Sequence, residues 1–256
     1  MLVWLALLPV LLLAPLLSRD QGTVVLTGKV SGRLSSDTVA VSVRENPLEA
    51  REQITYARLD SKGDFRLALP VQGPTRAELV YDDDVTELFL EPGNQLDIRF
   101  KSTDLAGSVR YKGRGAEANA FLAEMEAKFV ENEGFQVLPD NIMFYEAPFL
   151  SFLEYRRKEE LKFLEDNAAG FSPAFQDFVR ARITYSYAND RLTFQDLREQ
   201  VVATEGRLKM SPTYYDFLND KALINNPAAT RNGLYQEFLL NYIHHAAISG
   251  GTQRTD

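Results

Sequence analysis

The segment Gly113-Arg114-Gly115-Ala116-Glu117-Ala118 matches the G-x-G-x-x-G/A pattern that binds the pyrophosphate of a dinucleotide. Small residues in this pattern let main-chain N–H groups approach a phosphate at the start of a helix. The strand expected before this segment, however, ends an all-β series, and no parallel strand is evident after the helix that follows. We therefore interpret the segment as a flexible joint between a β domain and a helical region, and we predict no bound cofactor.

Two further clusters carry residue types that bind metals. Asp82-Asp83-Asp84, with Glu87 close behind, offers the hard oxygen ligands that Ca²⁺ prefers, but the run lacks the glycine-spaced loop of an EF-hand. Asp is common in turns, so a polar hairpin tip explains the run better. His244 and His245 are adjacent on an expected helix and point about 100° apart, so they do not readily share one ion. We predict one histidine at the edge of the core, one in solvent and no metal site.

Composition assigns no catalytic residue. The 256 residues include no Cys, which excludes disulfides, thiolate nucleophiles and a CxxC redox centre within them. Nothing singles out an acid–base pair among the 36 Asp and Glu, so a carboxylate-based hydrolase has only composition behind it. G-x-S-x-G, Walker A and H-E-x-x-H motifs are also absent. The net charge of −8 disfavours partners such as nucleic acid or an anionic membrane.

The first 18 residues, MLVWLALLPVLLLAPLLS, are uncharged and strongly apolar, as in the central part of an export signal. The run is short for a transmembrane helix, which needs about 20 residues, and Pro9 and Pro15 interrupt it. We therefore predict a signal peptide over residues 1–21, export to the periplasm or cell envelope, and no stable membrane span. An uncleaved N-terminal anchor and a buried helix are the alternatives.

Residues 22–115 have the spacing of short strands. About eight apolar or alternating segments follow one another with no helical stretch between them, which favours an antiparallel β-sandwich over βαβ units. Asp60-Ser61-Lys62-Gly63 is expected to be a hairpin loop with Gly at a position of positive φ. The strands are predicted over residues 23–30, 38–44, 54–59, 65–69, 77–81, 86–90, 96–100 and 109–112.

Residues 116–256 change to a helical period, so the fold class is α+β with segregated halves. A helix is predicted over residues 116–130, and apolar stripes at i, i+3 and i+4 continue through residues 175–183 and 234–243. Ser172-Pro173 and Ser211-Pro212 each have the pattern of an N-cap followed by proline at the first helical position. The run from Thr193 to Asp196 resembles a capping box with Asp in place of Glu.

The helical region carries most of the charge and most of the aromatic residues. Residues 116–256 account for −7 of the net charge, and they hold 21 of the 28 Phe, Tyr and Trp residues. At helical spacing most of these aromatics are expected in the core. A minority exposed beside a neighbouring domain would form a docking face, because aromatic side chains supply a large apolar area.

Several segments, taken in order, resemble one protein family. Residues 87–98 are similar to a recurring LFLEPGD-x-L-x-I stretch, and residues 113–122 to a G-x-GA-x-x-N-x-(F/Y)-L stretch. Further matching segments are Tyr214-Tyr215-Asp216-Phe217-Leu218, Asn225-Asn226-Pro227-Ala228-Ala229 and residues 235–242. Together they look like the N-terminal region of TlpA-like thioredoxin-fold proteins of the Bacteroidetes envelope.

The resemblance implies that a β-sandwich and a helical segment precede a thioredoxin domain with a W-C-x-x-C centre. No residue here matches that centre, so no catalytic residue is carried over. The leading hypothesis is an exported, non-catalytic accessory or scaffold region of a thiol–disulfide oxidoreductase, whose redox cysteines would lie beyond residue 256. Its partner would be a thioredoxin domain in cis or an envelope protein in trans. The alternative is a stand-alone envelope module that binds peptide or glycan.

Two residues in the matching segments have physical interpretations that do not need the family. Glu91-Pro92-Gly93-Asn94 has the signature of a type II turn, which makes a catalytic role for Glu91 improbable. Asn119, on the first predicted helix, is expected to bond main-chain groups at the junction between the sandwich and the helices.

Overall fold

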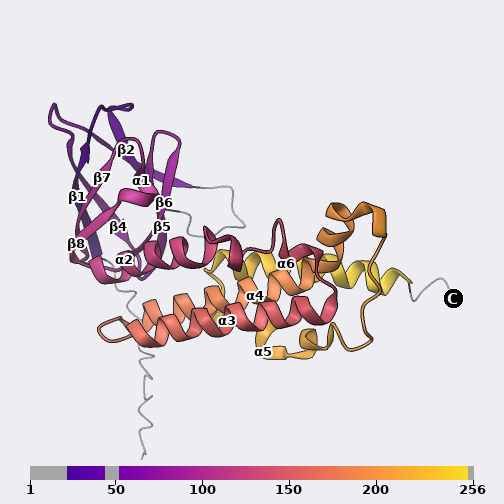
Figure 1. The fold of residues 1–256 in the computed structure, drawn as a ribbon. Coiled ribbons are helices and arrows are strands. Elements are labelled where there is room, and N and C mark those ends of the chain that lie inside the picture. The colour runs from indigo at the N-terminus through magenta and orange to yellow at the C-terminus, as the bar shows by residue number, and fades with distance from the viewer. Residues whose placement is uncertain (1–21, 44–51, 253–256) are drawn as a thin grey trace, which may run out of the picture.

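A computed structural model describes residues 22–43 and 52–252 of the chain. Within them an eight-stranded β-sandwich is followed by a mainly helical region, so the predicted fold class is confirmed (Figure 1). The predicted signal peptide at residues 1–21 and the last residue of the second predicted strand, Arg44, lie outside the described residues. No helix among the described residues has both the length and the apolar character needed to cross a membrane.

The eight predicted strands all form, in two sheets of four. One sheet has the order β4-β1-β7-β8 and the other β3-β2-β5-β6. All pairings are antiparallel except that of β1 with β7, which run in the same direction. The strands are β1 (Gly22–Ser31), β2 (Thr38–Val43), β3 (Gln53–Arg58), β4 (Asp64–Val71), β5 (Thr75–Tyr81), β6 (Asp84–Leu90), β7 (Gln95–Lys101) and β8 (Arg110–Arg114).

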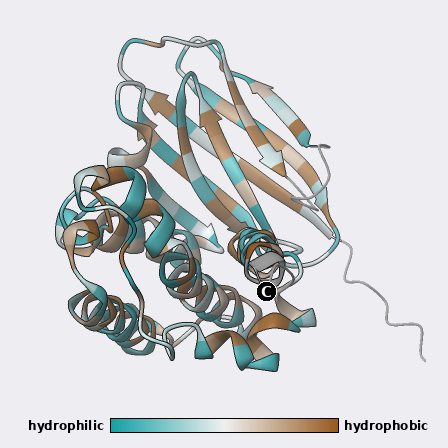
Figure 2. Ribbon diagram, turned by 90° about the vertical axis from the view of Figure 1, so that its right-hand side faces the viewer, coloured by the Kyte–Doolittle hydropathy of each residue, from teal (hydrophilic) through white to brown (hydrophobic). Residues whose placement is uncertain are grey.

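Alternation along the strands builds the core of the sandwich. In β4, every second residue from Phe65 to Val71 is buried while its neighbours are exposed, as the period of a half-buried strand requires. Figure 2 shows this alternation as brown and teal bands along the strands. Within the first sheet, β1 and β7 approach closely at Gly28, where an added Cβ would lie 2.0 Å from the main-chain oxygen of Ile98. The expected turn glycines, Gly63 and Gly93, both have positive φ.

The helical region is built on two long helices, α3 (Glu146–Asn167) and α4 (Pro173–Val201), with α6 (Gly233–Thr252) packed on α4. The predicted helix over residues 116–130 is α2 (Ala116–Met125) continued by a π-helical turn, η1 (Glu126–Val130). The shorter elements are α1 (Leu105–Ser108), η2 (Glu133–Phe135), η3 (Asn141–Met143), η4 (Ala203–Glu205), η5 (Asp216–Asn219), α5 (Lys221–Ile224) and η6 (Pro227–Ala229).

One of the three predicted helix starts is confirmed and two are wrong. Ser172 caps α4, accepting a hydrogen bond from the Phe175 N–H, with proline at the first turn. Ser211 starts no helix, because its N–H and hydroxyl both donate to the carboxylate of Glu146 in the first turn of α3. Thr193 lies inside α4, where its hydroxyl donates to the Asn189 carbonyl one turn back, so it cannot cap a helix.

The aromatic residues of the helical half lie mostly in the core, as predicted. Only Phe144, Tyr145 and Tyr155 among the 21 are exposed. Phe149 of α3 stacks on Phe194 of α4 with 3.7 Å between the ring centroids, and this pair anchors the two long helices. The aromatic cores therefore fix the spacing of the helices.

Asn119 joins the sandwich to the helices. It lies in the second turn of α2, has no exposed surface, and faces the free edge of β6. Its side-chain oxygen accepts from the Phe89 N–H at 2.9 Å, while its amide nitrogen donates to the carbonyls of Phe89 (3.0 Å) and Gly115 (2.8 Å). The Asn119 amide therefore pairs with β6 as a residue of a neighbouring strand would. The predicted junction role of Asn119 is confirmed.

Replacing Asn119 by Ala is expected to lower the free energy of unfolding by about 3 kcal/mol, because the buried N–H and carbonyl of Phe89 lose their partners. Urea denaturation followed by circular dichroism measures this loss. Asn219→Ala, at an exposed asparagine of η5, serves as the control and should change stability by no more than about 0.5 kcal/mol. Equal effects of the two substitutions would contradict the junction role.

Candidate functional site

The glycine pattern at residues 113–118 lies at the junction and not at an open phosphate site. Gly115 is the N-cap of α2 with φ of 96°, and a Cβ there would lie 2.7 Å from the side-chain oxygen of Asn94. A Cβ at Gly113 would lie 2.2 Å from the main-chain oxygen of Gln95. The two glycines thus allow β7 and β8 to approach closely. The segment joins the sandwich to α2, as predicted, but the joint is closely packed, whereas the sequence led us to expect a flexible one.

The acidic run Asp82-Asp83-Asp84 forms the tip of the β5–β6 hairpin, as predicted. Asp82 has φ of 54°, in the left-handed region that Asp tolerates in turns. Asp84 instead accepts a hydrogen bond from the Leu105 N–H at 3.3 Å and so fastens α1 to the sandwich. Within residues 22–43 and 52–252, no group of three or more His, Asp or Glu is placed to hold a metal ion.

The two histidines take the positions predicted for them. His244 is exposed, whereas His245 is half-buried against Tyr215, with 4.3 Å between the ring centroids. Burial lowers the pKa of His245 from its ordinary value. The imidazole of His245 packs against this ring, and the sequence holds no further histidine to complete a metal site.

Glu91 also serves the junction. Its carboxylate accepts a hydrogen bond of 2.8 Å from the hydroxyl of Ser172, the residue that caps α4. In the same turn, the side-chain oxygen of Asn94 accepts from the Glu91 N–H. The turn between β6 and β7 is thus bonded to the start of the longest helix, which places α4 against the outer face of the sheet.

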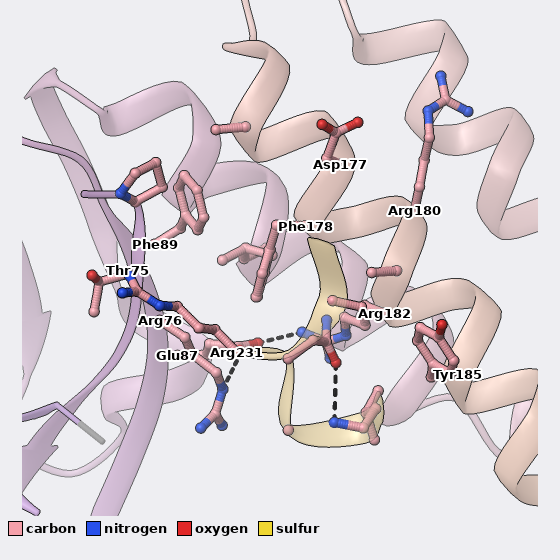
Figure 3. A pocket seen from close by; sticks show the side chains of 18 of the residues that line it. Thr75, Arg76, Glu87, Phe89, Asp177, Phe178, Arg180, Arg182, Tyr185 and Arg231 are labelled. Atoms are coloured by element: carbon pink, nitrogen blue, oxygen red, sulfur yellow. Dashed lines mark hydrogen bonds and ion pairs between the residues drawn. The ribbon is translucent and has the colours of Figure 1, made fainter. Parts of the chain in front are cut away.

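A cleft of about 1150 Å³ opens between this sheet face and the helices. One wall is formed by β5 and β6, the opposite wall by α4, and residues 226–234 close one end (Figure 3). Phe89 projects from β6 toward α4, where its ring lies 5.0 Å from that of Phe178. Since each wall comes from a different part of the chain, only the folded junction creates the cleft.

Arg182 of α4 holds the two walls of the cleft together. Its guanidinium pairs with Glu87 of β6 and, at 2.8 Å, with Glu126 at the start of η1. Glu87 is in turn paired with Arg76 of β5. Although burial opposes ionisation, the carboxylates of Glu87 and Glu126 raise the pKa of Arg182. The four groups neutralise one another, so they favour one geometry of the cleft and leave no free acid or base.

A second buried charge cluster lies between α3 and α4. Arg156, only 7% exposed, pairs with Asp190 and donates to the Phe135 carbonyl at 3.3 Å. Glu160, one turn along α3 from Arg156, is 7% exposed and is also attracted by Arg182. Burial raises the pKa of Glu160 from 4.5 to about 7, more than the two arginines lower it. We therefore expect the contribution of this cluster to the packing of α3 on α4 to depend on pH.

Two carboxylates of the cleft, those of Glu87 and Glu126, are thus held by arginines. In the sequence, Glu87 follows the acidic run Asp82-Asp83-Asp84, and Arg182 lies within the helical stretch of residues 175–183. No local pattern predicts the pairing of Glu87 with Arg182, because residues 95 positions apart meet only in the folded chain.

The sequence matches no protein-family model, and no curated protein matches it at a significant level.

The Glu160 carboxyl predicts a stability that falls as pH rises. Glu160 titrates near its ordinary value in the unfolded chain but near pH 7 in the folded chain, so the folded state binds more protons between about pH 4.5 and 7. Its contribution is complete below that window and is lost through it, by at most about 3 kcal/mol. Asp190, whose pKa burial raises despite Arg156, acts in the same direction.

Glu160→Gln is therefore expected to flatten the decline of the free energy of unfolding between pH 4.5 and 7 and to stabilise the protein at pH 8. Urea denaturation at a series of pH values provides the measurement. Glu165→Gln, at an exposed position of the same helix, is the matched control and should keep the decline. An unchanged pH profile in Glu160→Gln would show that the carboxyl is ionised at little cost.

Proposed function

We propose that this chain is an exported, non-catalytic scaffold region that serves a TlpA-like thiol–disulfide oxidoreductase of the cell envelope. The observation that carries the proposal is where the family-like segments lie. Residues 87–94 and 113–119 meet at the junction through Asn119, and Arg114 donates to the Gly93 carbonyl at 3.2 Å. These residues hold the sandwich against the helices, and such fixed positioning of one part on another favours a scaffold function.

The remaining family-like segments fasten the last part of the chain to α4. Arg191 of α4 donates to the Tyr214 carbonyl at 2.6 Å, and the Tyr214 hydroxyl donates to the Arg191 carbonyl at 2.7 Å. Asn226 donates to the Tyr185 hydroxyl at 2.9 Å, and the Tyr235 hydroxyl bonds to the same loop. The contacts of these family-like segments therefore favour a role in positioning one part of the protein on another. Because the sequence has no Cys, the redox chemistry would belong to the partner.

The outer face of α6 supports docking of that partner. Phe238 and Tyr235 are buried toward α4, whereas Leu240 (57% exposed), Ile243 (62% exposed) and Ala247 lie on the opposite side of the helix. This stripe, which we call the α6 outer face, lies on the helix that runs along α4 toward the C-terminus (Figure 1). A thioredoxin domain following in cis would begin beside it, and one bound in trans would find an apolar surface there.

The cleft favours a second candidate, the stand-alone binding module. A cavity of about 1150 Å³ between two rigid walls is large enough for a peptide or a glycan. Peptide and glycan arrays probed with the purified chain address it. Saturable binding without any affinity for an oxidoreductase would favour the stand-alone module over the scaffold.

The double substitution Leu240→Glu/Ile243→Glu is expected to weaken binding of a TlpA-like thioredoxin domain at least about tenfold, since two apolar contacts are replaced by charges. Titration of the purified chain with such a domain, its second active-site cysteine changed to Ser, measures the dissociation constant. Leu34→Glu, at an exposed leucine of the sandwich, is the matched control and should bind like the parent chain.

Failure of the parent chain to bind the thioredoxin domain, or equal binding by the double variant, would contradict docking at the α6 outer face. Turnover of a protein disulfide by the purified chain alone would contradict the scaffold role itself, because that reaction needs a thiolate.

A further inference from the structure

The cleft exposes a stretch of unpaired sheet edge. The strand order β3-β2-β5-β6 leaves β6 without a neighbouring strand on one side. Along such an edge, alternate residues direct both their N–H and their carbonyl away from the sheet. These groups are a template for hydrogen bonding to another extended chain.

The contacts of Asn119 show which residues of β6 direct their main-chain N–H and carbonyl groups away from β5. Its amide bonds both main-chain groups of Phe89 from the side opposite β5. Because the pattern has a period of two, the main-chain groups of Glu87 and Val85 point the same way. Among the described residues, no hydrogen bond reaches the main chain of Glu87 or Val85 from that side. The edge is thus closed by Asn119 at Phe89 and open at the next two outward positions.

The open positions lie inside the cleft. Val85 is 46% exposed, and both it and Glu87 line the cleft together with Ala106, Leu122 and Ala123. These small or apolar side chains offer no hydrogen-bond donor that would compete for the edge. The cleft is also larger than the ~300–1,000 Å³ of ordinary small-molecule sites. Its size and its edge chemistry both favour an extended polypeptide.

The charged residues around the cleft favour a ligand with one sign of charge. Arg76, Glu87, Arg182 and Glu126 pair among themselves. Five other charged residues line the cleft, and none of them forms an ion pair with another described residue. Three are acidic and two are basic: Glu131, Asp177 and Glu237 against Arg180 and Arg231. Figure 3 shows Arg180 and Asp177 both directed away from Glu87, which leaves Glu131 and Glu237 against Arg231. A segment with lysine or arginine is therefore complementary.

We propose that the cleft binds an extended, basic segment of another polypeptide, which adds as a strand to β6 at Val85 and Glu87. Strand addition draws its affinity from main-chain hydrogen bonds, so it tolerates many side-chain sequences. Such tolerance suits the client proteins of a disulfide oxidoreductase. The identity of the segment as part of a client rests on the proposed function, whereas the strand-addition site does not.

A blocked, fluorescein-labelled decapeptide of alternating valine and threonine with two lysines is the probe, titrated with the purified full chain and followed by fluorescence anisotropy. A twin peptide with N-methyl groups on alternate amides keeps the side chains but cannot form the edge hydrogen bonds. Saturable binding of the probe, with affinity for the twin at least about tenfold lower, is expected. Replacing both lysines by glutamate should weaken binding severalfold.

Val85→Pro removes one outward N–H and blocks the edge, and it should weaken probe binding at least about tenfold. Ile54→Pro on β3, the opposite edge strand of the same sheet, is the matched control and should bind the probe like the parent chain. Ala106→Trp, which fills the cleft from α1 without altering β6, gives a second test should Val85→Pro fail to fold.

Equal binding of the two peptides, no binding of the probe, or full binding by a folded Val85→Pro or Ala106→Trp variant would overturn the strand-addition site. The thioredoxin-domain titration separates this failure from that of the scaffold proposal. A chain that binds the domain but not the probe lacks the cleft site only. A chain that binds the probe but not the domain keeps the cleft site and loses the oxidoreductase as its partner.

Discussion

The structure depends on the amide of Asn119 pairing with the main chain of Phe89. This contact fixes the edge of β6 against α2, and with it the direction of every side chain on that strand. Leu88 and Leu90 point into the sandwich, while Phe89 points out, between Phe175 and Phe178 of α4, with 5.0 Å to each ring. Side chains of β6 therefore contribute to two hydrophobic cores. A shift of the strand by one residue would exchange the side chains that enter each core.

The charged residues around this junction specify geometry more than they add stability. Arg182 and Glu87 are both mostly buried, so the cost of removing them from water offsets much of their attraction. What the pairing does is exclude other arrangements, because α4 in any other rotation would leave a carboxylate without its cation. The hydrogen bond between Ser172 and Glu91 acts on the same helix at its first turn. Together the two contacts fix both the position and the rotation of α4.

Local patterns predicted the elements well, and they predicted the site poorly. Alternation located all eight strands because a half-buried strand has a period of two, and Ser172-Pro173 marked a true helix start. Ser211-Pro212 carried the same local signal, but the carboxylate of Glu146, 65 residues away, takes both of its donors. The role of Asn119 was predictable because a buried amide needs partners. The cleft was not, since it combines β5, β6, α4 and residues 226–234, and no period in the sequence relates them.

The parallel pairing of β1 with β7 affects how the chain can fold. Their contacts join residues about 70 positions apart, as in the 3.3 Å hydrogen bond from the Thr27 hydroxyl to the Leu96 carbonyl, 69 residues along the chain. Non-local pairing of this kind raises the contact order and slows folding, because the entropy of closing a long loop is lost before the contacts form. The ladder between β1 and β7 cannot form before β7 is available. During synthesis from the N-terminus, β1 thus lacks its partner on one side until nearly the whole sandwich has been made.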